Sequence, residues 1–284
     1  MGPRSATGME DEVKANRESN WLRRFPSQGA ALRLFCLPYA GGSARIYSDW
    51  HDWLAPEIEV VALELPGRGV NLRAAPIASM DELLTRLLAE MGPLLERPYA
   101  LFGHSLGGLV AFELARALDA GGGRAPAHLF VSALRAPHLP STRPALHALG
   151  DDELIAALRV TPGSPAALLD DDELLRLLLP VLRADFRLAE TPAPAPVPPL
   201  SMPLTVFGGL ADATLERGDL EAWRPYTSAS CQVRLVPGDH FFIHDFGHLV
   251  AVSLQDVLRA GRPAAAPPSS APVEMLLASG SAAS

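Results

Sequence analysis

Short, continuously apolar runs alternate along this chain with longer segments in which apolar residues recur every three or four positions. The apolar runs lie at 32–37, 59–65, 99–103, 128–134, 204–209 and 232–237. Runs of this length without alternation are typical of strands covered on both faces, as in a parallel sheet. The helical spacing is clearest at 80–95 and 106–120. Because the two patterns alternate, βαβ units are the simplest assembly, and we predict a doubly wound, mostly parallel α/β sheet.

The alternation is interrupted between residues 137 and 199, where no run has the character of a strand. Two helical patterns, at 151–160 and 168–190, fill this interval, and the second carries apolar residues on two neighbouring stripes. A helix with so wide an apolar arc is expected to cover neighbours on more than one side. We predict a helical lid insertion at about 140–198, the alternative being a purely structural subdomain. The acidic run DDDE at 170–173 favours a helix cap over a metal site.

Both ends of the chain lack the composition of a folded core. Residues 1–28 begin with a polar stretch, and residues 262–284 are rich in Pro, Ala and Ser. Such segments bury too little apolar surface to become ordered. We therefore predict disordered ends on either side of one α/β domain at 29–261. With 48% hydrophobic residues in a chain of 284, this domain can bury a large core.

Charge and composition exclude several classes of partner. The formal net charge is -8, and Lys14 is the only lysine, so a general polyanion binder is disfavoured and we expect no nucleic-acid partner. The first twenty residues lack the apolar core of a signal peptide, and we find no apolar run long enough to span a membrane. We expect a soluble, cytoplasmic protein. Cys36 and Cys231 lie in apolar, strand-like contexts, which favours buried thiols over a disulfide or a catalytic thiol.

The segment Gly103-His104-Ser105-Leu106-Gly107 follows an apolar run and precedes a helical pattern. This is the GxSxG pattern in the strand-turn-helix context that a nucleophile elbow requires. The two glycines permit the sharp turn that presents the serine hydroxyl beside a helix N-terminus. A phosphate-binding loop would need a following Lys and Ser or Thr, which are missing. Ser105 is therefore the predicted nucleophile, and an ordinary tight turn is the alternative.

A serine hydroxyl needs a base to remove its proton, and the base needs an acid to orient it. Among the histidines, His240 is best placed, because it follows the run 232–237 and leaves room for a final helix. His244 and His248 remain alternatives, and His104 is expected to pack away from the serine hydroxyl. The histidines at 51, 128, 138 and 147 lie in the wrong segments for this order. No pair of histidines has convincing metal-ligand spacing with a third partner, so we predict no metal.

The acid is expected to follow a strand and to precede the histidine in the chain. Asp212 meets both conditions, and the order Ser105, Asp212, His240 is that of α/β hydrolases. Two other aspartates remain alternatives. Asp219 has the position of a helix-start residue, and Asp239 is too close to His240 along the backbone to orient it easily.

A tetrahedral intermediate also needs hydrogen-bond donors for its oxyanion. One is expected to be the backbone amide of Leu106, directly after the nucleophile. The other is expected in the loop after the first predicted core strand, LPYAGGSARIY, where the amide of Ala40 is the best candidate. Gly41 and Gly42 in this loop are by themselves weak evidence, because they also suit an ordinary turn.

Taken together, these motifs resemble the type II thioesterases, the free-standing editing hydrolases of polyketide and nonribosomal peptide assembly lines. The resemblance covers Leu32 to Arg259 and rests on motifs that occur in the family's order. These are LPYAGGSARIYSDW, LELPGRGVNLR, LFGHSLGG, LLPVLRADFRLAE, VFGGLAD and GDHFF. GHSLGG alone indicates only a serine hydrolase, whereas PYAGG, PGR and LRADF are much more specific. The chain departs from the family after PGRGVNLR, where AAP replaces an acidic residue followed by proline.

The resemblance implies the fold, the substrate and the partner. It implies an α/β-hydrolase fold, with the catalytic residues on Ser105, Asp212 and His240 and the oxyanion amides on Ala40 and Leu106. The substrate is expected to be an acyl thioester on the phosphopantetheine arm of an acyl or peptidyl carrier protein, hydrolysed to clear stalled or wrongly primed chains. No cofactor beyond that arm is implied, and we expect a monomer.

Three other functions remain open at this point. A small-molecule carboxylic ester hydrolase could use the same residues, and a non-catalytic binding protein could use the same scaffold. A chain-releasing or cyclising thioesterase cut from a larger synthase is disfavoured, because no carrier-like attachment segment is found. Carrier proteins are usually acidic, as this chain is, so docking would need a local arginine patch or an apolar contact.

Overall fold

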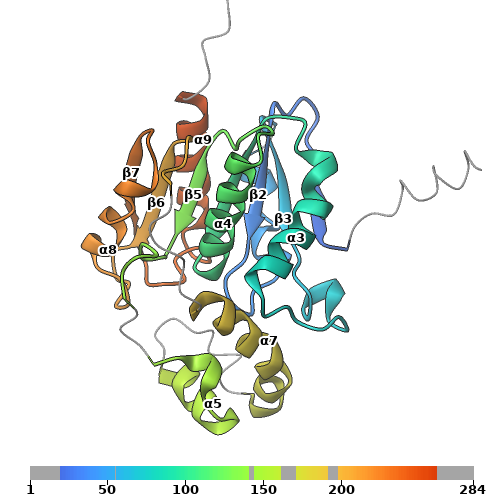
Figure 1. Ribbon diagram of the computed structural model, residues 1–284, viewed down its shortest axis with the longest axis vertical. Helices are drawn as coiled ribbons and strands as arrows, with labels where there is room; N and C mark the ends of the chain where they lie inside the picture. Colours follow the sequence, from blue (N-terminus) through green and yellow to red (C-terminus); the bar gives the residue numbers. More distant parts are fainter. Residues whose placement is uncertain (1–19, 55, 141–143, 161–170, 191–197, 261–284) are drawn as a thin grey trace, which may run out of the picture.

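The computed structural model describes residues 20–54, 56–140, 144–160, 171–190 and 198–260. In this part of the chain, one seven-stranded sheet has the order β1-β3-β2-β4-β5-β6-β7 (Figure 1). The strands are β1 (Leu22–Phe25), β2 (Leu32–Leu37), β3 (Ile58–Leu63), β4 (Tyr99–His104), β5 (Leu129–Ser132), β6 (Leu204–Gly209) and β7 (Cys231–Val236). From β2 to β7 every neighbouring pair is parallel. The predicted α/β sheet is confirmed.

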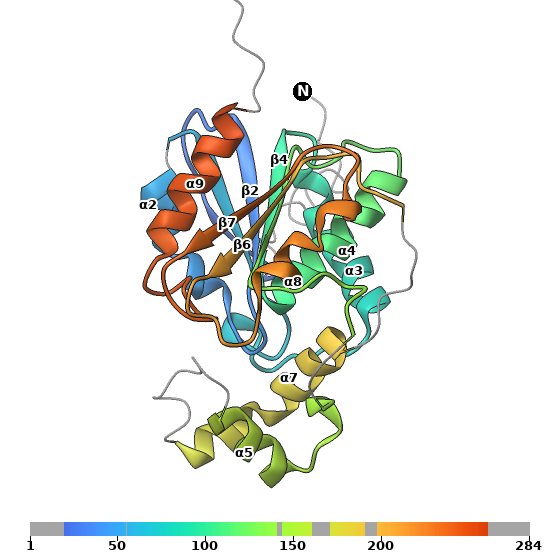
Figure 2. The same ribbon diagram turned by 90° about the vertical axis from the view of Figure 1, so that its left-hand side faces the viewer.

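Helices cover both faces of the sheet. They are α2 (Trp50–Leu54), α3 (Met80–Met91), α4 (Leu106–Ala120), α5 (Asp151–Val160), α7 (Asp172–Glu190), α8 (Arg217–Glu221) and α9 (Gly247–Ala260). Figure 2 shows α2 and α9 on one side of the sheet and α3, α4 and α8 on the other. Strand residues alternate between the two layers, so in β4 Leu101 packs toward α4 while Phe102 packs toward Trp50. Burial on both faces explains the continuous apolar runs.

The chain becomes ordered earlier than the predicted boundary at residue 29. Strand β1 pairs antiparallel with β3, with Leu22 opposite Leu63 and Phe25 opposite Val60. The prediction of disorder for residues 1–28 is therefore wrong for the segment from residue 20 onward. This strand has four residues, and its two central arginines are exposed, so it carries no continuous apolar pattern. Residues 1–19 and 261–284 lie outside the described residues.

Helices α5 and α7 pack together at one end of the sheet (Figures 1 and 2). Buried leucines of α7 contact α5, whereas Leu188, near the end of α7, joins the core beside α4. The helix thus covers neighbours on two sides, but the expectation for its second stripe holds only in the second half of the helix, where Val181 and Leu188 are buried, whereas Leu174 and Leu177 are exposed. The predicted cap is also present, because Leu174 N–H donates to Asp171 Oδ1 at 2.9 Å. Parts of the predicted insertion, at 141–143, 161–170 and 191–197, lie outside the described residues.

The strand order reverses between β2 and β4. From β2 the chain passes to β3 on one side and then returns to form β4 on the other side. In a parallel sheet, the crevice beyond the carboxyl ends of such strands is the usual place for a ligand. The segments that leave β2 and β4 here are the loop at 38–43 and the turn at Ser105.

Two further predictions concern the cysteines and the possibility of a membrane-spanning helix. Cys36 and Cys231 are free thiols, and burial raises the pKa of both, which makes them poor nucleophiles. Among the described residues, no helix combines the length and the apolarity needed to cross a membrane.

Candidate active site

Ser105 lies on the turn between β4 and α4 in a strained backbone conformation. Its φ is 53° and its ψ is -118°, values that a residue with a Cβ adopts only where its surroundings fix them. The backbone N–H of Ser105 donates to the carbonyl of Ser132 at 2.7 Å, which holds this turn against β5. The hydroxyl makes no capping bond to α4. It is therefore available as a nucleophile, rather than used as a helix cap.

The glycines on either side of the serine allow the backbone segments of the site to approach closely. A Cβ on Gly103 would overlap the carbonyl of Gly107, and a Cβ on Gly107 would overlap the carbonyl of Leu37. The end of β2 therefore lies directly against the first turn of α4. This contact requires glycine at both positions of the motif and brings the loop after β2 beside the nucleophile.

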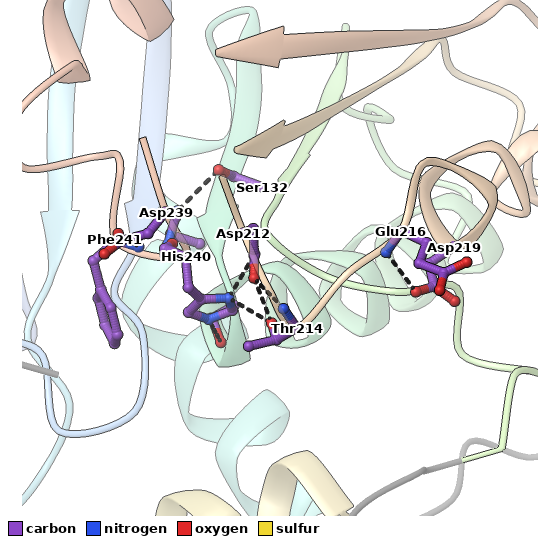
Figure 3. Close-up of polar contacts among 10 residues, drawn as sticks. Ser132, Asp212, Thr214, Glu216, Asp219, Asp239, His240 and Phe241 are labelled. Atoms are coloured by element: carbon purple, nitrogen blue, oxygen red, sulfur yellow. Dashed lines mark hydrogen bonds and ion pairs between the residues drawn. The ribbon is translucent and has the colours of Figure 1, made fainter. Parts of the chain in front are cut away.

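His240 and Asp212 complete a chain of hydrogen bonds that starts at Ser105. His240 Nε2 lies 3.2 Å from Ser105 Oγ, and His240 Nδ1 lies 2.9 Å from Asp212 Oδ2. A carboxylate only accepts, so Nδ1 carries the proton and Nε2 is free to accept the serine proton. Asp212 follows β6 and His240 follows β7, and Figure 3 shows the Asp212 carboxylate directed toward the His240 ring. The structure thus brings together the three residues that were predicted from the chain order.

Thr214 holds the Asp212 carboxylate, a role that the sequence analysis missed. Its backbone N–H and its hydroxyl donate to Asp212 Oδ1 at 2.8 and 2.7 Å, and the hydroxyl also lies 3.3 Å from His240 Nδ1. Burial alone would raise the pKa of Asp212, but the hydrogen bonds from His240 and Thr214 lower it below its ordinary value. Asp212 therefore stays charged opposite His240. A hydroxyl residue two positions after an aspartate was the available signal.

The other two candidate acids are held elsewhere. Asp219 accepts from the backbone of Glu216 at the start of α8 and pairs with Arg135 at 2.9 Å. Figure 3 shows Asp219 directed toward Glu216 and separated from His240. Asp239 accepts from the N–H of Phe241 at 2.8 Å, within its own loop. Neither carboxylate orients His240.

The alternative histidines have other partners. His244 Nε2 lies 2.9 Å from Tyr39 Oη, and the ring of His248 lies beside that of Trp53. The remaining side chains bond as follows: His51 to the Ser48 carbonyl, His128 to Thr205, His138 to Tyr226 and His147 to Glu190. His240 is the one histidine in the described part of the chain that is bonded to Ser105.

His104 is more than the packing residue that we predicted. It is fully buried, its Nε2 lies 2.8 Å from the carbonyl oxygen of His240, and its Nδ1 lies 2.9 Å from Ser132 Oγ. A carbonyl only accepts, so Nε2 donates to it and Nδ1 accepts from the Ser132 hydroxyl. Burial, reinforced by His240, lowers the pKa of His104 to about 3, so the ring is neutral near pH 7. A neutral His104 therefore ties the His240 loop to β4 and β5.

The oxyanion loop, residues 38–43, turns tightly beside the start of α4. Gly42 N–H donates to the carbonyl of Tyr39 at 2.9 Å, and Gly41 has a φ of 74°, as expected at the third position of a type II turn. Ala40 is the second residue of this turn. No described residue accepts a hydrogen bond from the amide of Ala40 or Leu106. Both predicted donors are therefore free for a ligand oxygen.

Metal chemistry finds no support among the described side chains. No group of three or more His, Cys, Asp or Glu in the described ranges has the arrangement to hold a metal ion.

A strained serine between a parallel strand and a helix, with Asp and His following in that order, defines an α/β hydrolase. Comparison with known proteins narrows this class. Residues 32–254 match the thioesterase domain family, and the chain belongs to this family.

The chain is similar to bacterial thioesterases and biosynthesis proteins over most of its length. It is 39% identical to the gramicidin S biosynthesis protein GrsT of Aneurinibacillus migulanus, covering 77% of this chain and 86% of the relative. Among solved structures it resembles RedJ, a thioesterase of the prodiginine pathway of Streptomyces coelicolor, with 39% identity and a TM-score of 0.75 over 84% of this chain and 94% of that one.

A second solved structure carries the type II designation. The type II thioesterase BorB of the borrelidin biosynthetic cluster is 35% identical, with a TM-score of 0.77, and the match covers 86% of this chain and 100% of BorB. The predicted resemblance to type II thioesterases is confirmed. The chain is a thioester hydrolase of the α/β-hydrolase fold.

Proposed function

We propose that the protein hydrolyses acyl thioesters on the phosphopantetheine arm of acyl or peptidyl carrier proteins, and so removes aberrant or stalled chains in polyketide or nonribosomal peptide biosynthesis. One observation carries the proposal: His240 lies 3.2 Å from Ser105 Oγ and 2.9 Å from Asp212. The similarity to biosynthetic thioesterases supports the choice of substrate.

Acylation begins when Ser105 Oγ attacks the thioester carbonyl and His240 Nε2 takes the serine proton. The tetrahedral oxyanion accepts hydrogen bonds from the amides of Ala40 and Leu106. Asp212, which stays charged, stabilises the imidazolium. The C–S bond then breaks, His240 returns the proton to the pantetheine sulfur, and the acyl group remains on Ser105. A thiolate is a better leaving group than an alkoxide, which suits a thioester substrate.

Deacylation repeats the same steps with water. His240 takes a proton from a water molecule, whose oxygen attacks the acyl carbon of the ester. When the second tetrahedral intermediate collapses, Ser105 Oγ recovers the proton from His240 and the free acid leaves. These steps require no metal and no cofactor bound by the protein itself, since the phosphopantetheine arm belongs to the partner.

Helices α5 and α7 act in this proposal as the lid that selects the acyl chain. Their position at the end of the sheet that bears Ser105 supports this role. Leu177 on α7 is 66% exposed and lies one helical turn before Val181, whose side chain packs against Gly67 in the loop after β3, so a bulkier residue there extends from the same face of the helix without repacking the core. Leu177→Trp is expected to change the preferred chain length. An unchanged preference across a chain-length series would contradict the lid role.

Ser105→Ala tests the mechanism most directly. Removing the nucleophile is expected to lower turnover of an acyl-carrier thioester by about 10⁴-fold or more. The exposed Ser230 offers a matched control, because Ser230→Ala removes a hydroxyl far from the site. Thermal unfolding and circular dichroism check that both variants fold, and an active-site serine probe should label Ser230→Ala but not Ser105→Ala. Full turnover by folded Ser105→Ala would overturn the mechanism.

A substrate panel separates this proposal from the other functions. Acyl-carrier, acyl-coenzyme A and simple ester substrates are compared at equal chain length, and the products are identified by mass. We expect the highest kcat/KM for the carrier thioester and a free acid as product. Preference for the simple ester would indicate an ester hydrolase. A cyclic product would indicate a chain-releasing enzyme, and the absence of turnover on all substrates would indicate a binding protein. The protein is proposed to act in the cytoplasm as a monomer. Light scattering with and without carrier protein tests the oligomeric state.

A further inference from the structure

Two sequence motifs have no part in the proton transfers of Ser105, His240 and Asp212. One is PGR at 66–68, in the loop after β3, and the other is LRADF at 182–186, in the second half of α7. These motifs are about 115 residues apart in the chain, yet they meet each other beside the oxyanion loop. The contacts at this meeting point give both motifs a specific task.

The meeting point is a buried ion pair. Arg68 donates to both oxygens of Asp185, with Nη1 2.7 Å from Oδ2 and Nη2 2.8 Å from Oδ1. The side chains are 5% and 1% exposed, so solvent stabilises neither charge. Burial of two charges is tolerated only where their geometry is good and their remaining hydrogen-bonding groups are satisfied. The bidentate arrangement meets the first requirement.

The oxyanion loop supplies the remaining partners. Gly41 N–H donates to Asp185 Oδ2 at 2.7 Å, and Arg68 Nη1 donates to the carbonyl of Gly42 at 3.3 Å. The ion pair thus holds an amide and a carbonyl of two consecutive residues in the turn. Ala40 directly precedes them, and its position follows from theirs because the Tyr39–Gly42 hydrogen bond closes the turn.

Helix α7 also packs side chains directly onto both loops, at two glycines that have no side chain of their own. A Cβ on Gly41 would lie 2.8 Å from a methyl group of Leu182, and a Cβ on Gly67 would lie 2.8 Å from a methyl group of Val181. The second half of α7 is therefore packed onto the oxyanion loop and held there by Asp185. A displacement of this half would separate Gly41 from its carboxylate acceptor.

We propose that Asp185 is a positioning residue for thioester hydrolysis: with Arg68 it fixes the turn that presents the Ala40 amide, so that the oxyanion hole is complete only while α7 is docked. This inference rests on the proposed function, since it assumes an acyl-Ser105 intermediate whose oxyanion accepts from Ala40. Asp185 acts through Gly41 and does not touch the reacting atoms. The helix that covers the site thereby also determines whether the Ala40 amide is in place to stabilise the oxyanion.

The test compares Asp185→Asn with a matched buried pair elsewhere. Glu59 is 3% exposed and pairs with Arg33 at 2.9 Å and with Arg24, at the opposite end of the sheet. Glu59→Gln therefore removes a buried carboxylate charge without touching the oxyanion loop. For each variant, kcat and KM are measured with an acyl-N-acetylcysteamine thioester. Binding is measured for an alkyl boronic acid, whose serine adduct has an oxyanion, and for a thioether analogue, which has none.

Asp185→Asn is expected to lower kcat by about 10- to 100-fold, less than the loss of about 10²- to 10³-fold on removing an oxyanion donor outright, because the Ala40 amide is displaced and not removed. KM should change by less than about 3-fold. Boronic acid affinity should fall in parallel while thioether affinity is retained. Glu59→Gln should lower thermal stability but leave the kcat of the folded protein and both affinities unchanged. Equal boronic acid affinity in wild type and folded Asp185→Asn would overturn the proposal.

A second variant covers the case in which Asp185→Asn does not fold. Arg68→Lys keeps the positive charge but loses the bidentate contact, so it should show a smaller loss of the same kind. Unchanged boronic acid affinity in this variant would also overturn the proposal. The Ser105→Ala experiment separates the two hypotheses. If turnover requires Ser105 but not Asp185, only the positioning role fails, whereas turnover without Ser105 refutes the underlying mechanism.

Discussion

The two ends of the central sheet contain buried polar residues of the same kinds in different surroundings. At the amino end, Arg33 near the start of β2 pairs with Glu59 near the start of β3, and Arg24 of β1 joins them. At the carboxyl end, Arg68 pairs with Asp185 across two loops and a helix. The first pair joins strands that already share backbone hydrogen bonds. The second joins segments that have no sheet ladder between them.

This difference shows where a buried charge affects catalysis. Hydrogen bonds from Arg24 and Arg33 lower the pKa of Glu59 despite its burial, so the charged carboxylate stabilises the native state above pH 4.5. As pH falls below 4.5, the unfolded chain takes up the proton first and this stability is lost. Asp185 instead accepts from a backbone amide beside the active site. We therefore expect matched substitutions to affect stability at the amino end and rate at the carboxyl end.

The largest difference is expected between the buried histidines. His104 holds the His240 carbonyl at the carboxyl end of β4, whereas His128 bonds to Thr205 Oγ1 at 2.9 Å at the amino ends of β5 and β6. His104→Leu should lower kcat by about 100-fold, because small misplacements of a catalytic group have effects of this size. His128→Leu should leave kcat of the folded protein unchanged. Steady-state kinetics on both purified variants provides the measurement.

The same two variants also test how the free energy of unfolding depends on pH. Burial lowers the pKa of His104 to about 3 and that of His128 to about 4, against 6.5 in the unfolded chain. Below pH 6.5 the unfolded state therefore binds protons that the native state does not, and the free energy of unfolding falls as pH falls. Each variant should lose part of this acid sensitivity. A partial rescue of kcat by His104→Gln, which can still donate to His240, would support positioning; equal kcat losses at 104 and 128 would contradict the contrast.

Much of the fold could be predicted because the sheet is buried on both faces. β2 and β6 coincide with the predicted apolar runs, and α4 coincides with its predicted helical segment. β1 was missed because a four-residue edge strand with two exposed arginines has no such pattern. Its position depends on pairing with β3 and on the contact of Arg24 with Glu59, which are long-range interactions.

The candidate site likewise contains residues that could be predicted from the sequence and residues that could not. Ser105, Asp212 and His240 could be placed together because each follows a strand of a parallel sheet, so chain order predicts their meeting. The roles of His104 and Asp185 could not be predicted, since each depends on a hydrogen bond to a backbone group far away in the sequence, whose position only the folded loops define. Thr214 differs, because its bond to Asp212 is local and the spacing of the two residues was an available signal. Motif resemblance marked PGR and LRADF as specific but gave no reason for them.

Two glycines at the ends of β2 provide a smaller contrast. Gly29 and Gly41 have φ values of 80° and 74°, so alanine is strained at both, by about 1 kcal/mol or more. A Cβ on Gly29 meets nothing within 4 Å, whereas a Cβ on Gly41 meets Leu182. Chemical denaturation should show a loss of stability for both variants, but only Gly41→Ala should also lower kcat. If Gly29→Ala lowers kcat equally, the two ends of β2 do not differ as argued.

The smallest contrast is between two hydrogen-bonded threonine hydroxyls, that of the half-buried Thr214 and that of the buried Thr205. Thr214 Oγ1 donates to Asp212 Oδ1 at 2.7 Å, and Thr205 Oγ1 lies 2.9 Å from His128 Nε2. Thr214→Val keeps the shape and the backbone N–H bond but removes the hydroxyl, so the pKa of Asp212 should rise. We expect kcat to fall about 3- to 10-fold, because the Thr214 amide and His240 still donate to the carboxylate. On acidification, kcat of this variant should begin to fall at a higher pH than kcat of the wild type, since Asp212 then takes up a proton more readily. Thr205→Val should leave the pH-rate profile unchanged and reduce stability alone. An unshifted profile in Thr214→Val would show that the Asp212 charge does not depend on the threonine beside it. A shifted profile in Thr205→Val would show that the effect is not confined to the threonine that contacts Asp212.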